Sequence, residues 1–363
     1  MRTLCTFLIG QMSSLSILNY QLITGGGDYM SVTMKDIAQE AGVSKATVSR
    51  VINNDSYVSE DTRRKVMKLV HKYDYKPHTV AQGLARDLSH TMGLMIPGPP
   101  RDITDPFFLE FLHGVGNTAA QYNYSLSLPT VSEKDKRELY DEGINFNQLD
   151  GVIVVNPKVD DFRIDYFQEK NLPFVFLGRP LEERENVCWV DGDNVGGAYE
   201  AVKYLIKQEH RKIACITGPN EFVASRLRLK GYKQALEEYN IDFDENLIIR
   251  GKFTRDSGYE KMKELLARDN SFSAVFVVSD AMAIGAMRAI KEQGIKVPDE
   301  CAVMGFDGID LGAFIEPTLT TVRQPAYELG EEAVESLIKV INGEDDFEYH
   351  KVLDLELLIR DSV

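Results

Sequence analysis

The chain has 363 residues, 44% of them hydrophobic and 27% charged, so it can bury a large core and is expected to form two or three domains. Its longest apolar runs are strand-length, far below the roughly 18 residues of a membrane-spanning helix, which excludes a helical membrane protein. Residues 30–90 hold 10 Lys and Arg against 7 Asp and Glu, whereas residues 91–363 hold 30 against 48. A basic head on an acidic body predicts that any nucleic acid binds to the head.

Residues 1–29 fit neither part. They lack the cleavage site of a signal peptide. The stretch from Gly26 to Met30 can be encoded by a purine-rich ribosome-binding sequence, so we expect translation to begin at Met30 and residues 1–29 to be a non-native or disordered extension. The four cysteines lie far apart without a CxxC spacing, which is typical of a reducing compartment, and we expect a cytoplasmic protein.

Residues 32–73 have the start and stop signals of three short helices. Thr33 can cap the first helix and Gly42 ends it, Ser44 begins the second, and the third runs from Ser59 to about Tyr73. Apolar residues recur at helical spacing along all three: Met34, Ile37, Ala38, Ala41, Val48, Val51, Ile52, Val66, Leu69, Val70. This is the spacing of a helix-turn-helix.

The second of these helices carries side chains suited to a DNA major groove: Lys45, Ala46, Thr47, Ser49 and Arg50. Arg50 can contact a guanine with two hydrogen bonds, Ala46 can contact a thymine methyl group, and the two hydroxyls can bind phosphates. The alternative is a protein-interaction module with a solvated basic face, in which Arg50 pairs with an acidic neighbour such as Asp55.

The head resembles the DNA-binding domain of the lactose-repressor/galactose-repressor family of bacterial transcription regulators. The resemblance rests on residues 32–38, 41–44 and 46–53 and on the pair Val58-Ser59. It implies a homodimer on a pseudo-palindromic operator. Besides the second helix, the residues that the resemblance places in contact with DNA are Thr33, Val58, His78, Thr79, Gln82 and Leu84.

Residues 78–85 have helical apolar spacing but are too few for a stable isolated helix, so they are expected to form a linker. The resemblance implies a hinge helix that folds on DNA, with Leu84 wedged between base pairs of the minor groove. The family usually has Asn at the position of His78 and often Arg at that of Gln82, and Gly83 lowers helix propensity.

Beyond residue 90, strand-like runs alternate with amphipathic segments: 91–97, 151–155, 174–177, 212–217, 247–251, 274–279 and 301–306. This alternation predicts parallel sheets with helices on both faces. The fold class is therefore an all-α helix-turn-helix head plus an α/β body of two doubly wound parallel-sheet lobes, which resembles a periplasmic sugar-binding protein. The expected domains are 30–76 (DNA-binding), 77–90 (hinge and linker) and 91–363, with one lobe at about 91–190 and 324–342 and the other at about 191–321 and 350–361.

Ligands of such sheets bind beyond the carboxyl ends of the strands. Polar and aromatic residues that suit a sugar follow several runs, and the resemblance implies an effector pocket lined by Arg228, Phe253, Ser279, Asp307 and Gln324. Phe107, Phe108 and Asp280 are further candidates. One of the two adjacent phenylalanines can belong to the core instead, and Asp280 can simply cap a helix; Asp193-Asn194 is expected to be such a cap.

The chain has no zinc spacing, phosphate-binding loop or nucleophile elbow, so we expect no metal, no cofactor and no enzyme activity. The predicted function is a sugar-responsive, homodimeric transcriptional repressor that binds no membrane. The segments 105–108 and 173–180 resemble the maltose-operon repressor branch, which suggests maltose or a maltodextrin. The alternatives are a sugar-binding protein that acts without DNA, a sugar-active enzyme, and a regulator that uses a co-repressor.

Overall fold

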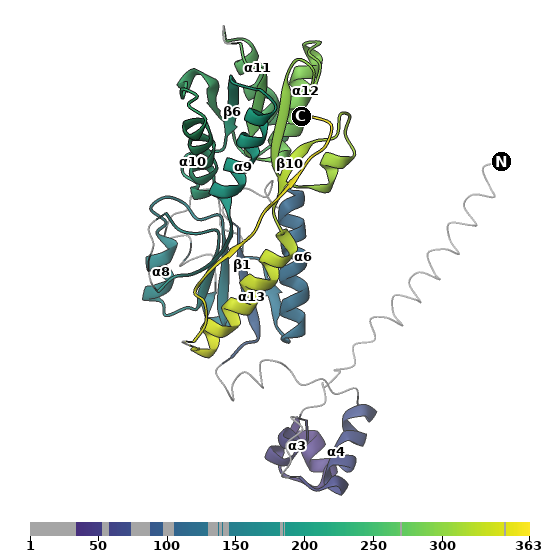
Figure 1. Ribbon diagram of the computed structural model, residues 1–363. Coiled ribbons are helices and arrows are strands. Elements are labelled where there is room, and N and C mark those ends of the chain that lie inside the picture. The colour runs from purple at the N-terminus through teal and green to yellow at the C-terminus, as the bar shows by residue number, and fades with distance from the viewer. Residues whose placement is uncertain are drawn as a thin grey trace, which may run out of the picture. The chain divides into compact units, whose positions relative to one another are not determined.

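The computed structural model describes residues 34–52, 58–73, 88–96, 105–129, 137, 140, 145–181, 184, 186–268, 271–344 and 346–363. Within these residues the chain forms two compact units, one up to Gln82 and one from Gly83 onward (Figure 1). We call the first unit the head and the second the body, and each is described by itself.

The head is a trio of helices: α2 (Met34–Ala41), α3 (Lys45–Ile52) and α4 (Glu60–Lys72). Their shared core is formed by Ile37, Ala38, Ala41, Val48, Val51 and Val66, as the apolar spacing predicts. Gly42 ends α2 at φ 69°, a left-handed conformation that glycine adopts without strain. The predicted caps at Ser44 and Ser59 are confirmed, since the Thr47 N–H donates to Ser44 Oγ at 3.0 Å and the Thr62 N–H donates to Ser59 Oγ at 3.4 Å.

The first sheet of the body has the strand order β11-β5-β4-β3-β1-β2. These strands are β1 (Thr91–Met95), β2 (Ser125–Ser127), β3 (Gly151–Val155), β4 (Phe174–Leu177), β5 (Cys188–Gly192) and β11 (His350–Leu353). Every pairing in this sheet is parallel. The helices around it are α6 (Pro106–Gln121), α8 (Arg163–Glu169) and α13 (Ala326–Asn342), of which α6 and α13 lie side by side in Figure 1.

The two faces of the first sheet are both covered, which explains why β3 is apolar throughout. Val152 and Val154 pack into an aromatic cluster with Phe167 of α8. Ile153 and Val155 point to the opposite face and pack with residues of α6 and α13.

The second sheet has the order β12-β10-β9-β8-β6-β7. Its strands are β6 (Ile213–Thr217), β7 (Ile248–Arg250), β8 (Ala274–Val277), β9 (Ala302–Asp307), β10 (Thr320–Arg323) and β12 (Glu356–Leu358). All pairs are parallel except β10 with β12. The helices that cover it are α9 (Asn194–Lys207), α10 (Val223–Glu238), α11 (Arg255–Leu266) and α12 (Asp280–Glu292), and short 3₁₀ turns lie at Phe146–Gln148, Glu245–Leu247 and Asp310–Ala313.

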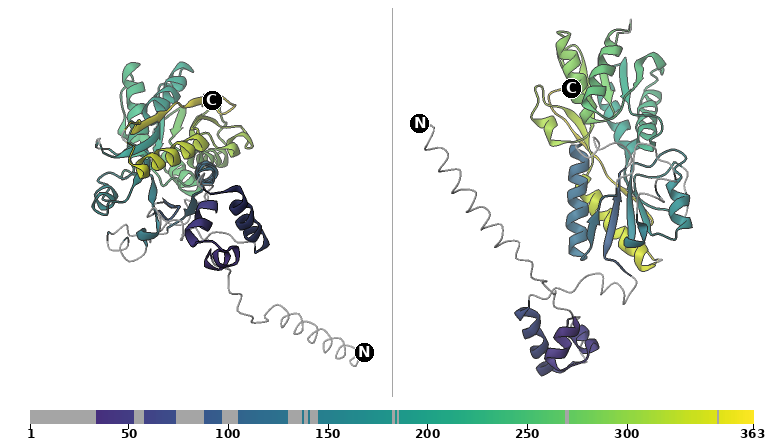
Figure 2. Two further views of the ribbon diagram at one scale, coloured as in Figure 1. Left: turned by 90° about the horizontal axis from the view of Figure 1, so that it is seen from below. Right: turned by 180° about the vertical axis from the view of Figure 1, so that it is seen from behind.

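The body therefore has two lobes, one for each sheet, and the chain passes between them after β5, after β10 and after β11 (Figures 1 and 2). The prediction that residues 350–361 lie in the second lobe is wrong for β11, which pairs with β5 of the first sheet. Short strands with few apolar residues carry little signal in the sequence, because their pairing depends on a neighbour far along the chain. Among the residues that the structure describes, no helix is long and apolar enough to cross a membrane.

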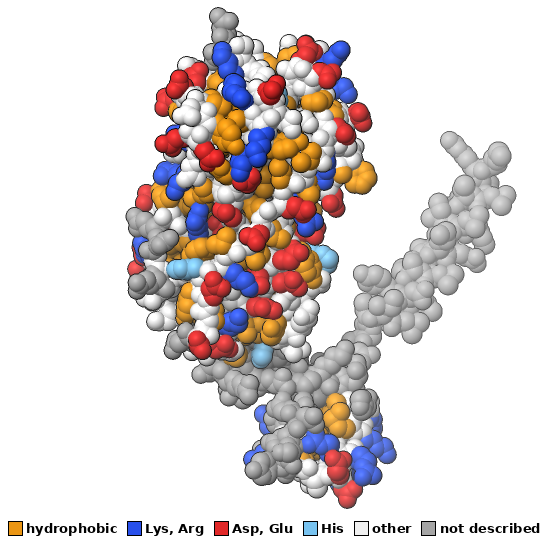
Figure 3. All heavy atoms as spheres, in the orientation of Figure 1, with side chains coloured by type: hydrophobic (Ala, Val, Ile, Leu, Met, Phe, Trp, Pro, Cys, Tyr) orange, Lys and Arg blue, Asp and Glu red, His pale blue; other side chains and the backbone are white. Residues whose placement is uncertain are grey.

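Side-chain charge follows the division seen in the sequence. Figure 3 shows Lys and Arg side chains on the described part of the head, whereas Asp and Glu side chains are frequent on the visible face of the body. The body helix α13 alone contains Glu328, Glu331, Glu332 and Glu335. Strong phosphate attraction is therefore expected from the head only.

Candidate functional site

The exposed surface of the head is centred on α3. Lys45 and Arg50 are exposed and Thr47 is half-buried, while Val48 and Val51 of the same helix are buried in the core. The Thr47 hydroxyl lies 2.8 Å from Ser44 Oγ. Because the core holds one side of α3, the other side remains available for a groove.

Several predicted DNA contacts cannot be placed. Thr33, His78, Thr79, Gln82 and Leu84 lie outside the described residues, as do residues 1–29 and Asp55. Ala46 and Ser49 lie on α3, but their side chains are not described, and Val58 is half-buried at the approach to α4.

The body has a pocket between its two lobes, at the carboxyl ends of the strands. It is narrow, with about 40 Å³ of free volume. Both lobes line it, with residues Phe107, Asn156, Pro157, Leu177, Gly178, Arg179, Asp191, Asn194, Ala224, Leu227, Arg228, Gln324 and Leu329. Three predicted effector residues are in this lining: Phe107, Arg228 and Gln324.

Arg228 is the centre of a buried polar network in the pocket. Its Nη1 donates to Asp307 Oδ1 at 3.0 Å and to the Val278 carbonyl at 2.6 Å, and its Nε donates to Asn194 Oδ1 at 2.7 Å. The guanidinium also lies 3.9 Å from the ring centre of Phe306. Burial and four contacts hold the guanidinium in one orientation, which preorganises it for a ligand.

Asp307 joins Arg228 to Gln324, whose Nε2 donates to Asp307 Oδ1 at 2.8 Å. Both of these side-chain bonds reach the same carboxylate oxygen, and the Ser279 hydroxyl is a further polar neighbour of the Asp307 carboxylate. Burial raises the pKa of Asp307, and the positive charge of Arg228 opposes that rise. The trio of Arg228, Asp307 and Gln324, predicted from separate parts of the sequence, thus forms one connected group.

Asp280 is close to this group but serves the fold. Its Oδ2 accepts from the N–H groups of Gly308 and Ile309 at 2.7 and 2.9 Å, and its Oδ1 accepts from the Thr321 hydroxyl at 2.6 Å. Burial, followed by the charge of Asp307, raises its pKa. These bonds use both oxygens to fix the loop after β9. They support a structural role for Asp280 over effector contact, and its side chain does not cap α12.

The remaining predicted effector residues divide between pocket and core. Phe108 is 5% exposed and packs with Phe111 in the core of the first lobe, whereas its neighbour Phe107 lines the pocket. Phe253 is half-buried beyond β7 and meets Phe222 edge to face at 6.2 Å. Ser279 is buried at the end of β8, next to the carbonyl that Arg228 binds.

Two polar residues of the pocket, Asp191 and Asn194, were not predicted from the sequence. Asn194 Nδ2 donates to Asp191 Oδ1 at 2.8 Å while its Oδ1 accepts from Arg228, so it links the two lobes. Burial raises the pKa of Asp191 to about 6, although the backbone N–H and the charge of Arg179 oppose the rise. The predicted cap is Asp193 alone, which accepts from the Gly196 N–H at 2.9 Å.

Three non-glycine residues around the cleft have positive φ angles. They are Asn156 at 53°, Phe253 at 38° and Asp307 at 120°, and each ends or follows a strand of one of the sheets. Such conformations cost about 1–3 kcal/mol each and concentrate at functional sites. Six further non-glycine residues of the described chain also have positive φ angles, so these conformations are not confined to this edge of the sheets.

Backbone hydrogen bonds join the two lobes at the wall of the pocket. The Val159 N–H donates to the Glu221 carbonyl at 2.8 Å, and the Val223 N–H donates to the Pro157 carbonyl at 3.1 Å. Lys158 and Phe222 form an antiparallel bridge between these bonds. We call residues 157–159 and 221–223 the clasp. It holds together two loops whose neighbours, Asn156 and Ala224, line the pocket.

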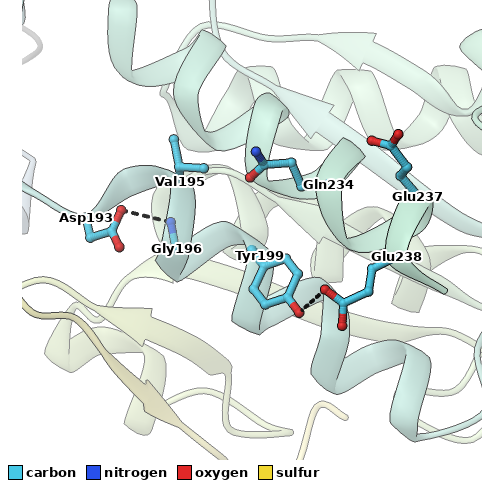
Figure 4. A pocket seen from close by; sticks show the side chains of 7 residues that line it. All are labelled: Asp193, Val195, Gly196, Tyr199, Gln234, Glu237 and Glu238. Carbon is cyan, nitrogen blue, oxygen red and sulfur yellow. Dashed lines mark hydrogen bonds between the residues drawn. The ribbon is translucent and has the colours of Figure 1, made fainter.

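A second hollow lies on the surface between α9 and α10 (Figure 4). Asp193, Glu237 and Glu238 give it an acidic rim, and the Tyr199 hydroxyl donates to Glu238 at 2.6 Å. None of the predicted effector residues line it. Among the residues that the structure describes, no group of three or more His, Cys, Asp and Glu side chains is arranged to hold a metal ion.

Comparison with known proteins gives matches in both parts of the chain. Residues 33–78 match the family described as bacterial regulatory proteins, lacI family, and residues 202–363 match the periplasmic binding protein-like domain. The HTH-type transcriptional repressor CytR of Escherichia coli (strain K12) is 37% identical over 333 residues, which cover 92% of this chain and 96% of CytR.

Solved structures agree with these matches. A structure of the transcriptional regulator CelR–cellobiose complex is 34% identical with a TM-score of 0.72, and the match covers 92% of this chain and 100% of that one. The Lac repressor dimer bound to operator and the anti-inducer ONPF is 28% identical with a TM-score of 0.80, covering 91% and 98%. The predicted architecture of a helix-turn-helix head and a body with two parallel sheets is thereby confirmed.

Proposed function

The chain belongs to the LacI family of bacterial regulatory proteins and is a DNA-binding transcriptional regulator rather than an enzyme; from this premise we propose that it is a cytoplasmic, homodimeric repressor controlled by a small sugar. The observation that carries the proposal is the network of Arg228, Asp307 and Gln324 in a pocket shared by two lobes. We assign residues 30–76 to DNA binding, 77–90 to the hinge and 91–363 to effector binding and dimerisation.

The head reads the operator through α3. Arg50 contacts a guanine in the major groove, Ala46 contacts a thymine methyl group, and Lys45, Thr47 and Ser49 contact the backbone or neighbouring bases. Thr33 and Val58 lie at the helix ends that approach the phosphates. In the hinge, Leu84 inserts between base pairs, supported by contacts from His78, Thr79 and Gln82.

The effector binds between the lobes of the body. Arg228 and Asp307 hydrogen-bond its hydroxyl groups, Phe253 covers an apolar face of the ring, and Gln324 connects the ligand to a crossing between the lobes. Phe107 belongs to the pocket lining, and we assign the buried Ser279, next to the carbonyl that Arg228 binds, to the same site. Because ligand contacts come from both lobes, binding changes the angle between them and so the spacing of the two hinges in a dimer.

For the effector we propose maltose or a maltodextrin, on the resemblance of residues 105–108 and 173–180 to the maltose-operon branch. The cellobiose of the CelR complex shows that a related body takes a disaccharide. The sugar panel described next tests both the identity of the sugar and whether it weakens or strengthens operator binding.

The proposal is tested by selecting an operator from random duplexes with the purified chain and then measuring binding with each of a panel of mono- and disaccharides. We expect a palindromic site and at least one sugar that shifts both the melting temperature and the operator affinity. Arg50→Ala should lower selectivity at one base pair by about 1–3 kcal/mol, and Leu84→Ala should weaken operator binding without changing sugar affinity. A chain that prefers no duplex over random DNA would refute the proposal.

A further inference from the structure

The body contains a buried serine hydroxyl for which the sites described above give no role. Ser225 is 1% exposed, and among the described residues its Oγ has no hydrogen-bond partner. A buried hydroxyl without a partner costs free energy, and in a native protein it needs an explanation such as a missing ligand group or water.

Ser225 lies beside the effector pocket. It precedes Arg228 by three residues on α10, so the two side chains project from the same side of the helix. Its neighbours Ala224 and Leu227 line the pocket together with Arg228. Ser225 itself is not in this lining, and its hydroxyl is buried directly behind the wall that these neighbours form.

The surroundings of Gly218 place the Ser225 hydroxyl under the ring of Phe253. A Cβ atom at Gly218 would lie 2.5 Å from Ser225 Oγ and 2.4 Å from Phe253 Cζ, so both groups cover the same glycine. Gly218 directly follows β6, at the carboxyl edge of the second sheet, where α/β folds bind ligands. An aromatic face beside a hydroxyl is the combination that a sugar ring requires.

The first turn of α10 supplies backbone hydrogen-bond donors near the Ser225 hydroxyl. The helix has 16 residues, and its N-cap residue Phe222 makes no side-chain cap. The Val223 N–H is used by the clasp, but the next N–H groups have no acceptor within the helix. The Ser225 hydroxyl can both donate and accept, which matches the hydroxyl of a sugar.

The local charge favours a neutral group over an anion. The guanidinium of Arg228 is paired with the carboxylate of Asp307 and also bonds Asn194 and a carbonyl. Asp280, the next buried carboxyl group, is close enough to Asp307 to affect its protonation. Arg179, the other arginine in the described lining, lies 4.0 Å from the Asp191 carboxylate, so both lining arginines already have an acidic partner that an anion would have to displace.

We propose that Ser225 is a specificity-determining residue of the second lobe, whose hydroxyl binds a hydroxyl group of the sugar effector under Phe253. The inference rests on the proposed function for the ligand class. It extends that function by assigning an additional contact on the first turn of α10.

The first test uses the full-length chain without ligand. If the Ser225 hydroxyl is unsatisfied until a ligand arrives, Ser225→Ala should raise the melting temperature by about 2 °C. The matched control is Ser362→Ala: Ser362 is also buried, but it accepts from the Thr320 N–H at 2.8 Å and donates to the Val303 carbonyl at 2.6 Å, so its loss should lower the melting temperature. A comparable fall for Ser225→Ala would show that the hydroxyl is already satisfied, for example by a buried water, and would overturn the proposal.

The second test measures binding of maltose, cellobiose and ribose by calorimetry. For each sugar that binds the parent chain, Ser225→Ala should weaken binding roughly 2- to 10-fold, the loss of one neutral hydrogen bond. A deoxy analogue that lacks the contacted hydroxyl should bind parent and variant equally. Unchanged affinity of the variant for every bound sugar would overturn the proposal. If no sugar binds the parent chain, the proposed sugar function fails, while the ligand-free comparison still decides whether Ser225 is unsatisfied.

Discussion

Two buried arginine–aspartate pairs in the described part of the body have the same chemistry but different roles. In the first lobe, Arg163 and Asp161 are two residues apart, and Nε and Nη2 donate to the two carboxylate oxygens at 2.7 and 2.5 Å. In the second lobe, Arg228 and Asp307 are 79 residues apart and share one bond of 3.0 Å. We call them the local pair and the distant pair.

The two pairs differ in which parts of the chain they connect. The local pair saturates both oxygens of Asp161, whose carboxylate also accepts from the N–H groups of Lys158 and Arg163, so it closes a loop. The distant pair brings together a helix and a strand end at the cleft, and Asp307 uses one oxygen for Arg228 and Gln324. The local pair therefore fixes one loop, whereas the distant pair connects separate elements at the edge of the pocket.

The largest effect is expected from breaking the local pair. Asp161→Ala leaves a buried guanidinium that cannot lose its proton, so the free energy of unfolding should fall by about 3–5 kcal/mol. Urea unfolding followed by circular dichroism measures the loss. The control is Asp165→Ala. Asp165 lies in the adjoining helix α8 and pairs with Arg184 at the surface. Equal midpoints for the two variants would contradict the role assigned to the local pair.

Breaking the distant pair should cost less stability and more function. Arg228→Met keeps the volume of the side chain and leaves Asp307, which can take up a proton because burial already raises its pKa. The expected loss is about 1–3 kcal/mol, together with loss of the sugar response and retention of operator binding. Arg226→Met, two residues away with its Nε on the Asn220 carbonyl, is the control. Normal induction in the Arg228 variant would show that the pocket is elsewhere.

A smaller effect is expected on the pH dependence of stability, through Asp191. Asn194 connects the carboxyl group of Asp191 to Arg228 of the distant pair. The pKa of Asp191 is about 6 in the folded chain and about 3.9 when unfolded, so the folded state favours the protonated form. Stability should therefore fall by about 1 kcal/mol between pH 5 and pH 7 through this group. Asp191→Asn should remove that slope from the difference between variant and parent, whereas the cap variant Asp193→Asn should not. Parallel curves for Asp191→Asn and the parent would rule out the assignment.

The smallest effect is expected at an exposed pair of the same type. Arg288 and Glu292 are one helical turn apart on α12 at 2.9 Å, and the Arg288 side chain is 74% exposed. Solvent and salt screen such pairs, so Arg288→Ala should leave the melting temperature unchanged within error. A clear fall in the melting temperature would mean that burial does not decide whether an arginine–carboxylate pair stabilises the fold.

Most of the architecture could be predicted from the sequence because its signals are local. The caps Ser44 and Ser59, the turn at Gly42 and the apolar runs of β3 and β4 each depend on a few neighbouring residues. The resemblance also identified Arg228, Asp307 and Gln324, which the structure brings together.

What escaped prediction depends on contacts between distant segments. Asn194 belongs to the expected helix cap Asp193-Asn194 and Asp191 lies in β5, and only the approach of α10 makes Asn194 a link to Arg228. Asp280 follows a strand like a ligand-binding residue, yet the loop after β9 folds back onto both of its oxygens. Ser225 carries no signal of its own, because its significance comes from the lack of a partner in the folded body.

The clasp has a consequence for how mutational data on this protein should be interpreted. Its bonds run from main-chain amide to main-chain carbonyl, so alanine scanning across 157–159 and 221–223 leaves every one of them in place. Proline at 223 is the informative exchange: it removes one amide donor at the first helical position, where its ring fits, and Phe222 already has the extended φ of −90° and ψ of 132° that precede proline. The contact between the lobes at this place therefore depends on the path of the main chain, whichever side chains these loops carry.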